Sequence, residues 1–369
     1  MASLARLIDP IHRLRRRLFR RPEPPKGILI ISAGGLGDTV LFSLVAERFS
    51  SLAGPRELVT VLLRHDGVKT AFCLPDKLEV LTVNFGRFDK DITYRWKMQE
   101  TLFKANYRLA LSTDFLRHPF LDETMIAACD ALEAIAMKAR PWPKYDVQLT
   151  ANRRLFTRIF DSGETRRDKV VRWNDFANWI TGTELLPPEV RLTKPFADKI
   201  EEKASREVII QPFSAIRAKQ VAPTCYEALI NALPSNTVVR ITGLNSDLDA
   251  YPEIRRLTEL DSVVFDPSTF SEIAPRLQTA DLVISVDTAL MHLAVALGAP
   301  TLCLASAAYV GEIVPYDPCI CPNNVTFLYE NLPCAGCLGD CIYPLIDGRY
   351  ACVEELTPQR VVEQAQAML

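Results

Sequence analysis

Short apolar runs, each closed by turn-forming residues, alternate with segments of helical period along most of this chain. The first run, Ile28–Ser32 (ILIIS), is followed by a glycine turn and by an apolar segment, 36–50, that predicts a helix. Similar apolar runs follow at 57–63, 77–83 and 107–113. Strands that are apolar throughout are buried on both faces, so the pattern predicts an α/β fold with a parallel sheet covered by helices.

A second alternating series begins after residue 206. Apolar strands are predicted at 207–212, 236–243, 262–266, 281–286 and 300–305, and helices at 224–233, 246–257, 271–279 and 288–297. The segment between the two series, 183–195, contains prolines and has no clear period, which marks a domain boundary. A chain of 369 residues suits two domains, and we expect two Rossmann-like domains facing across a cleft.

The predicted organisation has five parts. A basic N-terminal extension and linker is followed by the first domain, a linker, the second domain with a Cys-rich loop at 319–352, and a C-terminal helix. The corresponding ranges are 1–26, 27–185, 186–206, 207–356 and 357–369.

Charge is unevenly distributed along the chain. Residues 1–26 have a net charge of +6, whereas the whole chain has −2, so the chain as a whole is not a nucleic-acid binder by charge. Ile11, Leu14 and Leu18 share one helical face among arginines, a pattern that fits an anionic membrane surface; the alternative is a solvated basic tail. Because no apolar run is long enough to span a membrane, we expect a cytoplasmic protein whose basic end contacts the inner face of the inner membrane.

The motif SAGGLGD, at 32–38, joins the first strand to the first helix. Its glycines, Gly34, Gly35 and Gly37, permit a sharp turn but do not fit the dinucleotide fingerprint, and no G-K-[ST] follows. What remains is Asp38 in the first helical turn. It is either a helix-capping acid or a carboxylate placed for catalysis.

A second motif, DTALMHLAVALGAP, begins at Asp287. The backbone amides of Thr288, Ala289 and Leu290 open a helix, have no acceptors within it, and therefore form an anion site. His292 shares a helical face with Thr288, and it is either a packed histidine or a ligand.

A third motif, QPFSAIRAK, follows a strand of the second half. Its hydroxyl and its cation, Ser214 and Lys219, suit the binding of a phosphate group. Taken alone, Lys219 also fits an ordinary surface lysine.

Six of the ten cysteines lie between 319 and 352. Cys334, Cys337, Cys341 and Cys352 have spacings that suit a tetrahedral structural zinc or iron site. The alternative is a loop of reduced thiols in a reducing compartment.

Together these motifs resemble glycosyltransferase family 9, the bacterial heptosyltransferases of lipopolysaccharide synthesis and their relatives. The resemblance rests on GLGD at 35–38, QPFSAIRAK at 211–219 and DTALMHLAVALGAP at 287–300, and it covers about residues 27–369. It implies a GT-B fold, with the acceptor bound mainly by the first domain and the sugar-nucleotide donor by the second. It also implies that helix 357–369 packs back on the first domain.

The resemblance further implies roles for individual residues. Asp38 resembles the catalytic base, on the acceptor-side loop of Gly34, Gly35 and Gly37. Lys219 resembles a catalytic cation that binds the donor phosphates. The other expected donor ligands are Ser214, Gly243, Asp247, Asp287, Thr288, Ala289, Leu290 and His292. The cysteine segment resembles the four-cysteine iron site of relatives that modify autotransporter proteins.

The function so implied is inverting transfer of a heptose-like sugar from a nucleotide sugar, ADP-heptose, to a lipopolysaccharide core or another glycan or lipid-linked acceptor, without a catalytic metal. Ala289 stands where the family usually has glycine, which leaves the donor sugar open. Two alternatives are a protein O-heptosyltransferase acting on an autotransporter, favoured by the cysteines, and a non-catalytic sugar-nucleotide-binding relative. Asp38 together with Lys219 argues against the non-catalytic interpretation.

Overall fold

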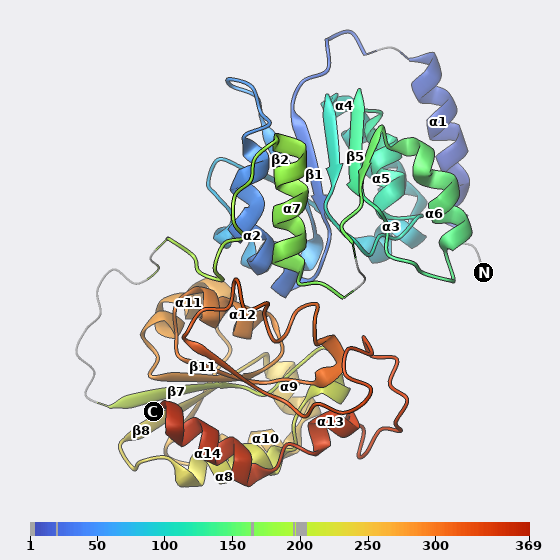
Figure 1. The fold of residues 1–369 in the computed structure, drawn as a ribbon. Helices are drawn as coiled ribbons and strands as arrows, with labels where there is room; N and C mark the ends of the chain where they lie inside the picture. Colours follow the sequence, from blue (N-terminus) through green and yellow to red (C-terminus); the bar gives the residue numbers. More distant parts are fainter. Residues whose placement is uncertain (1–3, 20, 164–165, 195, 197–204) are drawn as a thin grey trace. The chain divides into compact units, whose positions relative to one another are not determined.

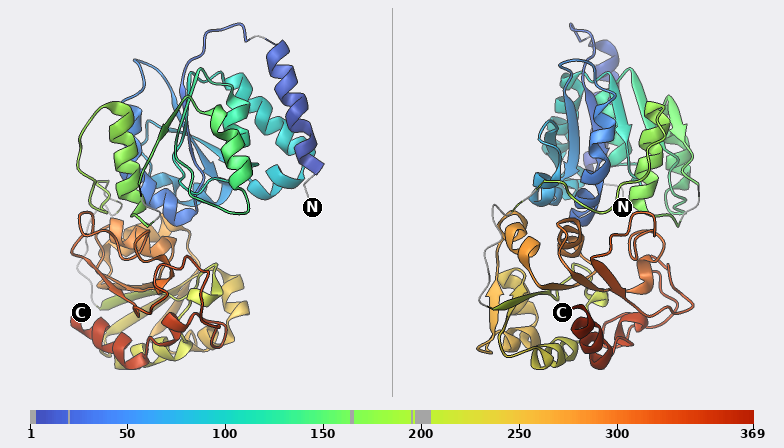
Figure 2. Two further views of the ribbon diagram at one scale, coloured as in Figure 1. Left: turned by 45° about the vertical axis from the view of Figure 1, so that its right-hand side comes forward. Right: turned by 60° about the vertical axis from the view of Figure 1, so that its left-hand side comes forward.

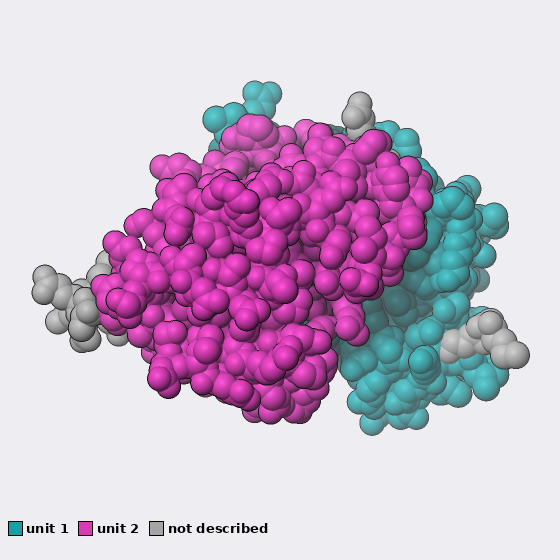
Figure 3. All heavy atoms as spheres, turned by 90° about the horizontal axis from the view of Figure 1, so that it is seen from below, with its two compact units in different colours: residues 1–165, 172–186 teal, residues 166–171, 187–369 magenta. Residues whose placement is uncertain are grey.

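The computed structural model describes residues 4–19, 21–163, 166–194, 196 and 205–369. The chain divides into two compact units, coloured separately in Figure 3: unit 1 is 1–165 with 172–186, and unit 2 is 166–171 with 187–369. Each unit contains a six-stranded parallel sheet, so the predicted α/β class is confirmed. Within the expected linker, 186–206, residues 195 and 197–204 lie outside the described residues.

The sheet of unit 1 has the strand order β3-β2-β1-β4-β5-β6 (Figure 1). Its central strand, β1, pairs with β2 and β4, with Ile30 opposite Val61 and Leu111. The strands are β1 (Ile28–Ser32), β2 (Val59–Arg64), β3 (Glu79–Val83), β4 (Leu109–Ser112), β5 (Glu133–Met137) and β6 (Arg158–Phe160). All five side chains of β1 are buried, as expected for a strand covered on both faces.

Helices cover both faces of this sheet. Leu29 and Ile31 of β1 pack with α3, α4 and α5, whereas Phe42 and Phe49 of α2 meet aromatic rings of α7. The helices are η1 (Leu4–Leu7), α1 (Ile8–Leu18), α2 (Leu36–Ser50), η2 (His65–Cys73), α3 (Phe85–Lys90), α4 (Ile92–Ala105), α5 (Asp122–Cys129), α6 (Asp146–Asn152), η3 (Arg153–Leu155) and α7 (Lys169–Thr181).

Two strands of unit 1 were not predicted from the sequence, and the N-terminal segment differs from the prediction. Strand β5, EAIAM, contains two alanines, which have low strand propensity, and β6 is only three residues long. The expected N-terminal extension is instead part of unit 1: α1 lies alongside α4 and α5 in Figures 1 and 2. The sequence favoured an extension because the proline-rich segment after α1 resembles a linker.

Unit 2 has the strand order β12-β11-β10-β7-β8-β9, again all parallel. Its strands are β7 (Arg206–Gln211), β8 (Thr237–Thr242), β9 (Val263–Asp266), β10 (Leu282–Val286), β11 (Thr301–Leu304) and β12 (Val325–Leu328). Its helices are η4 (Arg217–Lys219), α8 (Pro223–Ala232), α9 (Asn245–Ala250), α10 (Pro252–Leu257), α11 (Phe270–Thr279), α12 (Ala289–Ala296), η5 (Ala307–Tyr309), α13 (Ala351–Glu354) and α14 (Pro358–Met368).

Two details of unit 2 differ from the prediction. A sixth strand, β12, follows the five expected ones; it is short and only its last residue is fully buried. The helix expected at 246–257 is divided into α9 and α10 at Pro252, because a proline cannot donate the backbone hydrogen bond that would continue the helix.

The C-terminal helix packs within unit 2, whereas the family resemblance implies packing on the first domain. Val361 and Ala365 of α14 are buried in the hydrophobic core of unit 2, and Gln366 Nε2 donates to the carbonyl of Ala232 in α8 (3.3 Å). The apolar face of α14 is therefore buried within unit 2.

Among the residues that the structure describes, no helix combines the length and apolar character needed to cross a bilayer.

Candidate active site

In unit 1, the loop after β1 is shaped around Asp38. The Oδ2 atom of Asp38 accepts a hydrogen bond from the backbone N–H of Gly35 (2.8 Å). A Cβ added at Gly34 would lie 2.5 Å from the Cβ of Asp38 and 2.6 Å from its Oδ2, so only glycine fits there. Gly35 has no such restriction, because its nearest contact would be Asp38 Oδ2 at 3.8 Å. Asp38 caps α2 from the first turn, which also contains Gly37, and it stays partly exposed.

A second carboxylate, which the sequence analysis missed, reaches the same loop. Asp114 follows β4, the neighbour of β1 in the sheet, and its Oδ2 accepts from the backbone N–H of Ala33 (2.7 Å). The carboxyl ends of adjacent parallel strands lie at one edge of a sheet, where α/β proteins bind ligands. The signal was present in the sequence, since an acid follows the apolar run of β4 just as Asp38 follows β1.

In unit 2, Lys219 and Asp287 form an ion pair that is almost fully buried. Asp287 follows β10, and Lys219 closes the short helix η4 after β7; these two strands are neighbours in the sheet. The Lys219 ammonium also lies 4.5 Å from the centre of the Tyr309 ring. The structure thus joins two residues that the sequence predicted separately, and it excludes the interpretation of Lys219 as an ordinary surface lysine.

His292 completes this cluster from α12. Its Nε2 lies 3.9 Å from Asp287 Oδ1, and its Nδ1 is hydrogen-bonded to the hydroxyl of Tyr316 (2.6 Å). Burial raises the pKa of Tyr316 well above its usual value, which keeps the hydroxyl protonated as a partner for the imidazole. Tyr316 was not predicted, and nothing in the sequence around it indicates this role.

The first turn of α12 lies beside this cluster. Thr288 is the N-cap residue, in an extended conformation and without a capping hydrogen bond from its side chain. Its hydroxyl lies 3.3 Å from that of Ser285. The first backbone hydrogen bond of α12 runs from the N–H of His292 to the carbonyl of Thr288, so the amides of Ala289 and Leu290 have no acceptor within the helix. Helix α12 therefore directs its positive dipole end and these donors to the carboxyl edge of the sheet.

The remaining predicted donor ligands have local structural roles. Ser214 Oγ accepts from the N–H of Ile216 (3.2 Å), and Asp247 Oδ2 accepts from the N–H of Leu244 (2.7 Å) at the start of α9. A Cβ at Gly243 would lie 2.5 Å from the Phe213 ring, so glycine is required there by packing. These residues follow β7 and β8 at the same edge of the sheet as Lys219.

The Cys-rich loop brings three of its four predicted ligands together. The Sγ atoms of Cys334, Cys337 and Cys341 all lie within 4.8 Å of one another, and those of Cys334 and Cys341 are 3.8 Å apart. Burial and the neighbouring thiol of Cys341 raise the pKa of Cys334 to about 11. Cys352 lies outside this group: its side chain is buried in the core of unit 2, and its sulfur accepts from the N–H of Ala307 (3.4 Å). The structure therefore groups three of the four predicted ligands, and the thiol of Cys352 is still near enough to interact electrostatically with those of Cys337 and Cys341.

Several solved structures have a similar fold. E. coli ADP-heptose lipopolysaccharide heptosyltransferase II is similar over 93% of this chain and 98% of its own (TM-score 0.64, 16% identity). A family 9 glycosyltransferase from Veillonella parvula is similar over 94% and 97% (TM-score 0.66, 14% identity). The iron-containing dodecameric glycosyltransferase TibC from enterotoxigenic E. coli is similar over 94% and 76% (TM-score 0.55, 16% identity). At such identities the similarity shows the fold, which is that of the GT-B heptosyltransferases.

Sequence comparisons assign the family. No curated protein matches the chain. The family model described as glycosyltransferase family 9 (heptosyltransferase) matches residues 92–338. This range includes Lys219, Asp287 and two of the three clustered cysteines, whereas Asp38 precedes it and Cys341 follows it. Because this match covers more than half of the chain, the protein belongs to glycosyltransferase family 9.

Proposed function

We propose that the protein is an inverting glycosyltransferase that transfers a heptose-like sugar from ADP-heptose to a lipopolysaccharide core or another glycan or lipid-linked acceptor. The observation that carries the proposal is the buried Lys219–Asp287–His292 cluster beside the N-terminus of α12. Family membership supports it. So do the fold-similar structures, which include E. coli WaaC with ADP or with ADP-2-deoxy-2-fluoro heptose, and TibC with ADP-D-beta-D-heptose.

On the donor side, the reaction needs stabilisation of a leaving group. Negative charge grows on the nucleoside diphosphate as the glycosidic bond breaks, and fixed cations and N–H groups that meet this charge lower the barrier. Lys219 supplies the cation, and the first amides of α12 supply donors along the helix dipole. Asp287 and its contact with His292 hold Lys219 in place. Lys219 and the first amides of α12 then provide the charge stabilisation that a divalent metal provides in other enzymes.

On the acceptor side, a sugar hydroxyl is a weak nucleophile and needs a base. Asp38 is the base in this proposal: it is partly exposed at the carboxyl edge of its sheet, and Gly34 and Gly35 fix its position. General base catalysis typically contributes about 10²–10⁴-fold to the rate. Attack on the face opposite the diphosphate inverts the anomeric centre.

The three clustered cysteines suit a structural metal ion, and we include zinc or iron in the proposal. Sulfur atoms bound tetrahedrally at about 2.3 Å from a metal lie roughly 3.8 Å apart, which matches the distance between Cys334 and Cys341. The iron-containing TibC supports iron. Such an ion would stabilise the loop between β12 and α13 and would take no part in sugar transfer.

A second candidate function is protein O-heptosyl transfer to an autotransporter, which would use the same donor site. The cysteine cluster favours it, since the fold-similar TibC is an iron-containing heptosyltransferase. A non-catalytic sugar-nucleotide-binding role is opposed by Asp38, which such a module would not need. A cytoplasmic location belongs to the proposal as well and fits cysteines that are all free thiols.

The proposal is tested by screening purified protein against ADP-, UDP- and GDP-sugars. We expect thermal stabilisation by ADP-heptose and by ADP, and release of ADP from ADP-heptose when an acceptor is present. A stronger response to UDP- or GDP-sugars would overturn the choice of donor. Binding of ADP-heptose without ADP release on any acceptor would favour the non-catalytic alternative.

A further inference from the structure

The N-terminal helix α1 exposes its apolar face and buries its polar face. Leu7, Ile11, Leu14 and Leu18 follow one another at intervals of four, three and four residues, so they form one stripe, here called the α1 stripe. Between 58% and 71% of each of these side chains is exposed. A surface helix of a globular protein normally turns such a face to the core.

The opposite face of α1 is anchored by polar contacts. Asp9 accepts hydrogen bonds from Arg95 Nε (2.7 Å) and Nη2 (2.6 Å) and from Gln99 Nε2 (2.7 Å). The Arg95 side chain is completely buried beneath the helix, and so is His12. Turning α1 about its axis would break the Asp9–Arg95 ion pair and leave the Arg95 charge buried without its partner, which is strongly destabilising. The fold therefore specifies the orientation of α1.

Ion pairs at both ends hold the helix in the same orientation. Before α1, the Arg6 guanidinium pairs with Asp89 (2.8 Å). Towards its C-terminus, Arg15 pairs with Glu100, and after it Arg21 Nη1 donates to the carbonyl of Cys129 (2.9 Å). The α1 stripe is thus presented by a fixed helix rather than by a segment that must fold first.

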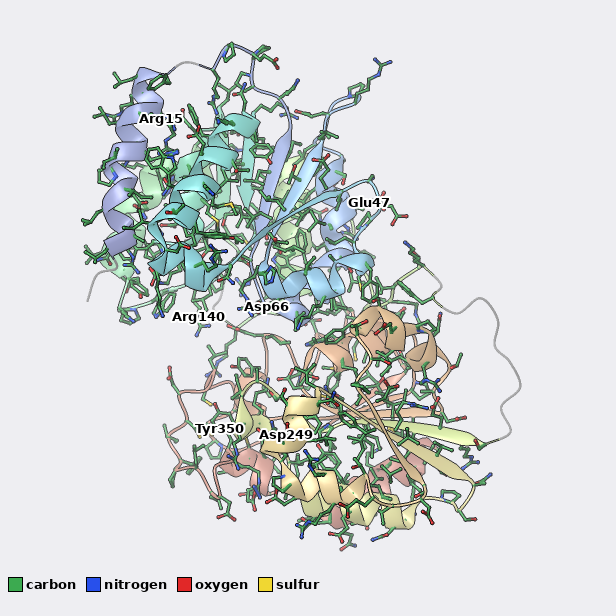
Figure 4. The ribbon with its side chains drawn as sticks, turned by 180° about the vertical axis from the view of Figure 1, so that it is seen from behind. Arg15, Glu47, Asp66, Arg140, Asp249 and Tyr350 are labelled. Atoms are coloured by element: carbon green, nitrogen blue, oxygen red, sulfur yellow. The ribbon has the colours of Figure 1, made fainter. Side chains whose placement is uncertain are left out.

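Basic side chains border the α1 stripe. Arg13 and Arg17 are exposed next to it on α1. On the side of α4 lies an open depression of about 570 Å³, and Arg15, labelled in Figure 4, is part of its wall. The depression is lined by Arg15, Trp96, Lys97, Glu100, Thr101 and Lys104. Cations and a tryptophan around an apolar strip are the composition found at membrane–water interfaces.

We propose that α1 docks unit 1 onto the surface of an anionic phospholipid bilayer. The α1 stripe enters the boundary between head groups and acyl chains, while Arg13, Arg17 and the lysines of the depression contact lipid phosphates. A second copy of the chain suits this surface less well, because a two-fold contact through the stripe would bring the arginines of both copies together. The inference rests on the geometry of α1 alone, so it stands or fails independently of the donor, the acceptor and the catalytic residues.

The test is co-sedimentation of the full-length protein with vesicles of phosphatidylcholine, with and without phosphatidylglycerol. We expect binding to the anionic vesicles that weakens as salt is added. The triple variant Ile11→Ser, Leu14→Ser, Leu18→Ser should bind at least about tenfold less, since each leucine or isoleucine loses its buried apolar area. Arg13→Gln with Arg17→Gln should also lower binding by roughly tenfold. The matched control is Leu132→Ser with Val147→Ser, two equally exposed apolar residues of unit 1 outside α1, which should bind like wild type.

A second variant keeps the proposal testable if the triple variant is unstable. Leu14→Trp preserves the apolar stripe, and its fluorescence should shift to the blue and be quenched by lipids brominated near the head groups only when anionic vesicles are present. The proposal would be overturned if the wild-type protein does not bind anionic vesicles, or if a well-folded triple variant binds them as tightly as wild type. A concentration-dependent dimer that the triple variant abolishes would assign the stripe to a second copy instead.

Discussion

Single residues at the carboxyl edges of the two sheets carry the proposed chemistry. In unit 1, Gly34 and Asp38 are interdependent, because the carboxylate occupies the space in which a side chain at position 34 would lie. In unit 2, Lys219 and Asp287 neutralise each other in a nearly buried ion pair. Each pair fixes the position of one charged group: the Gly34–Asp38 pair fixes the carboxylate of Asp38, and the Lys219–Asp287 pair fixes the ammonium of Lys219.

Replacing Gly34 by alanine should displace Asp38. The new Cβ would lie 2.5 Å from that of Asp38, so the carboxylate or the loop must move, and we expect a loss of stability of about 1–3 kcal/mol. Transfer activity should fall at least about tenfold, with ADP affinity unchanged, as measured by steady-state kinetics and calorimetry. The matched control is Gly35→Ala, whose Cβ meets Asp38 only at 3.8 Å. Equal activity of both variants would contradict the role of Gly34.

The Lys219–Asp287 pair allows a test that separates folding from donor binding. Lys219→Met leaves Asp287 buried without its cation and should destabilise the protein by about 3–5 kcal/mol. Adding Asp287→Asn removes the unpaired charge and should restore much of that stability. ADP affinity should be lowered at least about tenfold in both variants, because neither has the cation for the phosphates. A double variant that binds ADP as tightly as wild type would refute the phosphate role; Lys138→Met, an exposed lysine of unit 1, is the control.

At residue scale, motifs of the sequence could select residues of the candidate site but could not predict their contacts. Asp38, Lys219, Asp287 and His292 could be selected because each follows an apolar run or opens a helix. The hydroxyl of Tyr316 on His292 could not, since the two residues are 24 positions apart and only the fold joins them. The position of Cys352 could not be predicted for a related reason: its spacing suits a metal ligand, whereas the fold buries its side chain in the core of unit 2.

At the scale of secondary-structure elements, α1 and the Cys-rich loop are the features that a generic α/β fold does not require. Helix α1 packs on α4 through a polar face that includes His12, whose ring lies edge-on to Trp96 (5.2 Å) and to Phe103 (6.3 Å). Burial is the main reason that the pKa of His12 is lowered from 6.5 to about 4, with a smaller contribution from Arg16. Glu100 and Asp9 act in the opposite direction.

His12 should make stability fall as the pH is lowered. Its neutral form is favoured in the folded state, so its contribution is complete above about pH 6.5 and is lost as the unfolded chain takes up a proton between pH 6.5 and 4. Over that range the free energy of unfolding should drop by roughly 3 kcal/mol on account of this group. His12→Phe keeps an aromatic ring and should flatten the pH dependence of urea unfolding, whereas His65→Phe, at an exposed site, should not. Parallel pH profiles for wild type and His12→Phe would refute the prediction.

The Cys-rich loop should bind about one metal ion per chain. Protein purified without oxygen in the presence of zinc or iron should contain the ion by elemental analysis, and a chelator should lower the melting temperature. Cys337→Ser should abolish metal binding, whereas Cys319→Ser, at an exposed cysteine outside the cluster, should not. If Cys352→Ala still binds the metal ion, the site consists of three cysteines. If this variant loses the ion, Cys352 turns from the core to act as a fourth ligand. If the purified wild-type protein contains no metal and its melting temperature does not change with the chelator, the metal site is refuted.

Elements with strong local signals were predicted well, whereas those that depend on tertiary contacts were not. Strand β1 and helix α12 are apolar segments with turn residues at their ends, and the structure has them where they were expected. Strand β5 depends on pairing with β4 and β6, which no local pattern reveals. The packing partner of α14 depends on which apolar surface the rest of the fold leaves exposed. In unit 2 that surface belongs to α8, on which α14 packs.

At the scale of the whole molecule, the chain forms two α/β units, each built on a parallel sheet. The proposed donor-side groups are in unit 2, the proposed base is in unit 1, and the chain passes from one unit to the other after residues 165, 171 and 186. Strand–helix alternation in both halves of the sequence was sufficient to predict this architecture, because a parallel sheet needs a crossover helix between consecutive strands. The identity of the acceptor is not encoded in any such pattern, so the function must be tested with substrates.

The most direct test of the central claim compares wild type with Asp38→Asn, using ADP-heptose and heptose-deficient lipopolysaccharide. We predict that wild type releases ADP and forms a heptosylated product, with no loss of rate in EDTA. Asp38→Asn should lower kcat by about 10²–10⁴-fold, while ADP affinity measured by calorimetry stays within about twofold of wild type. A wild-type enzyme that transfers no sugar from any nucleotide donor, or an Asp38→Asn variant that transfers it at the wild-type rate, would contradict the account.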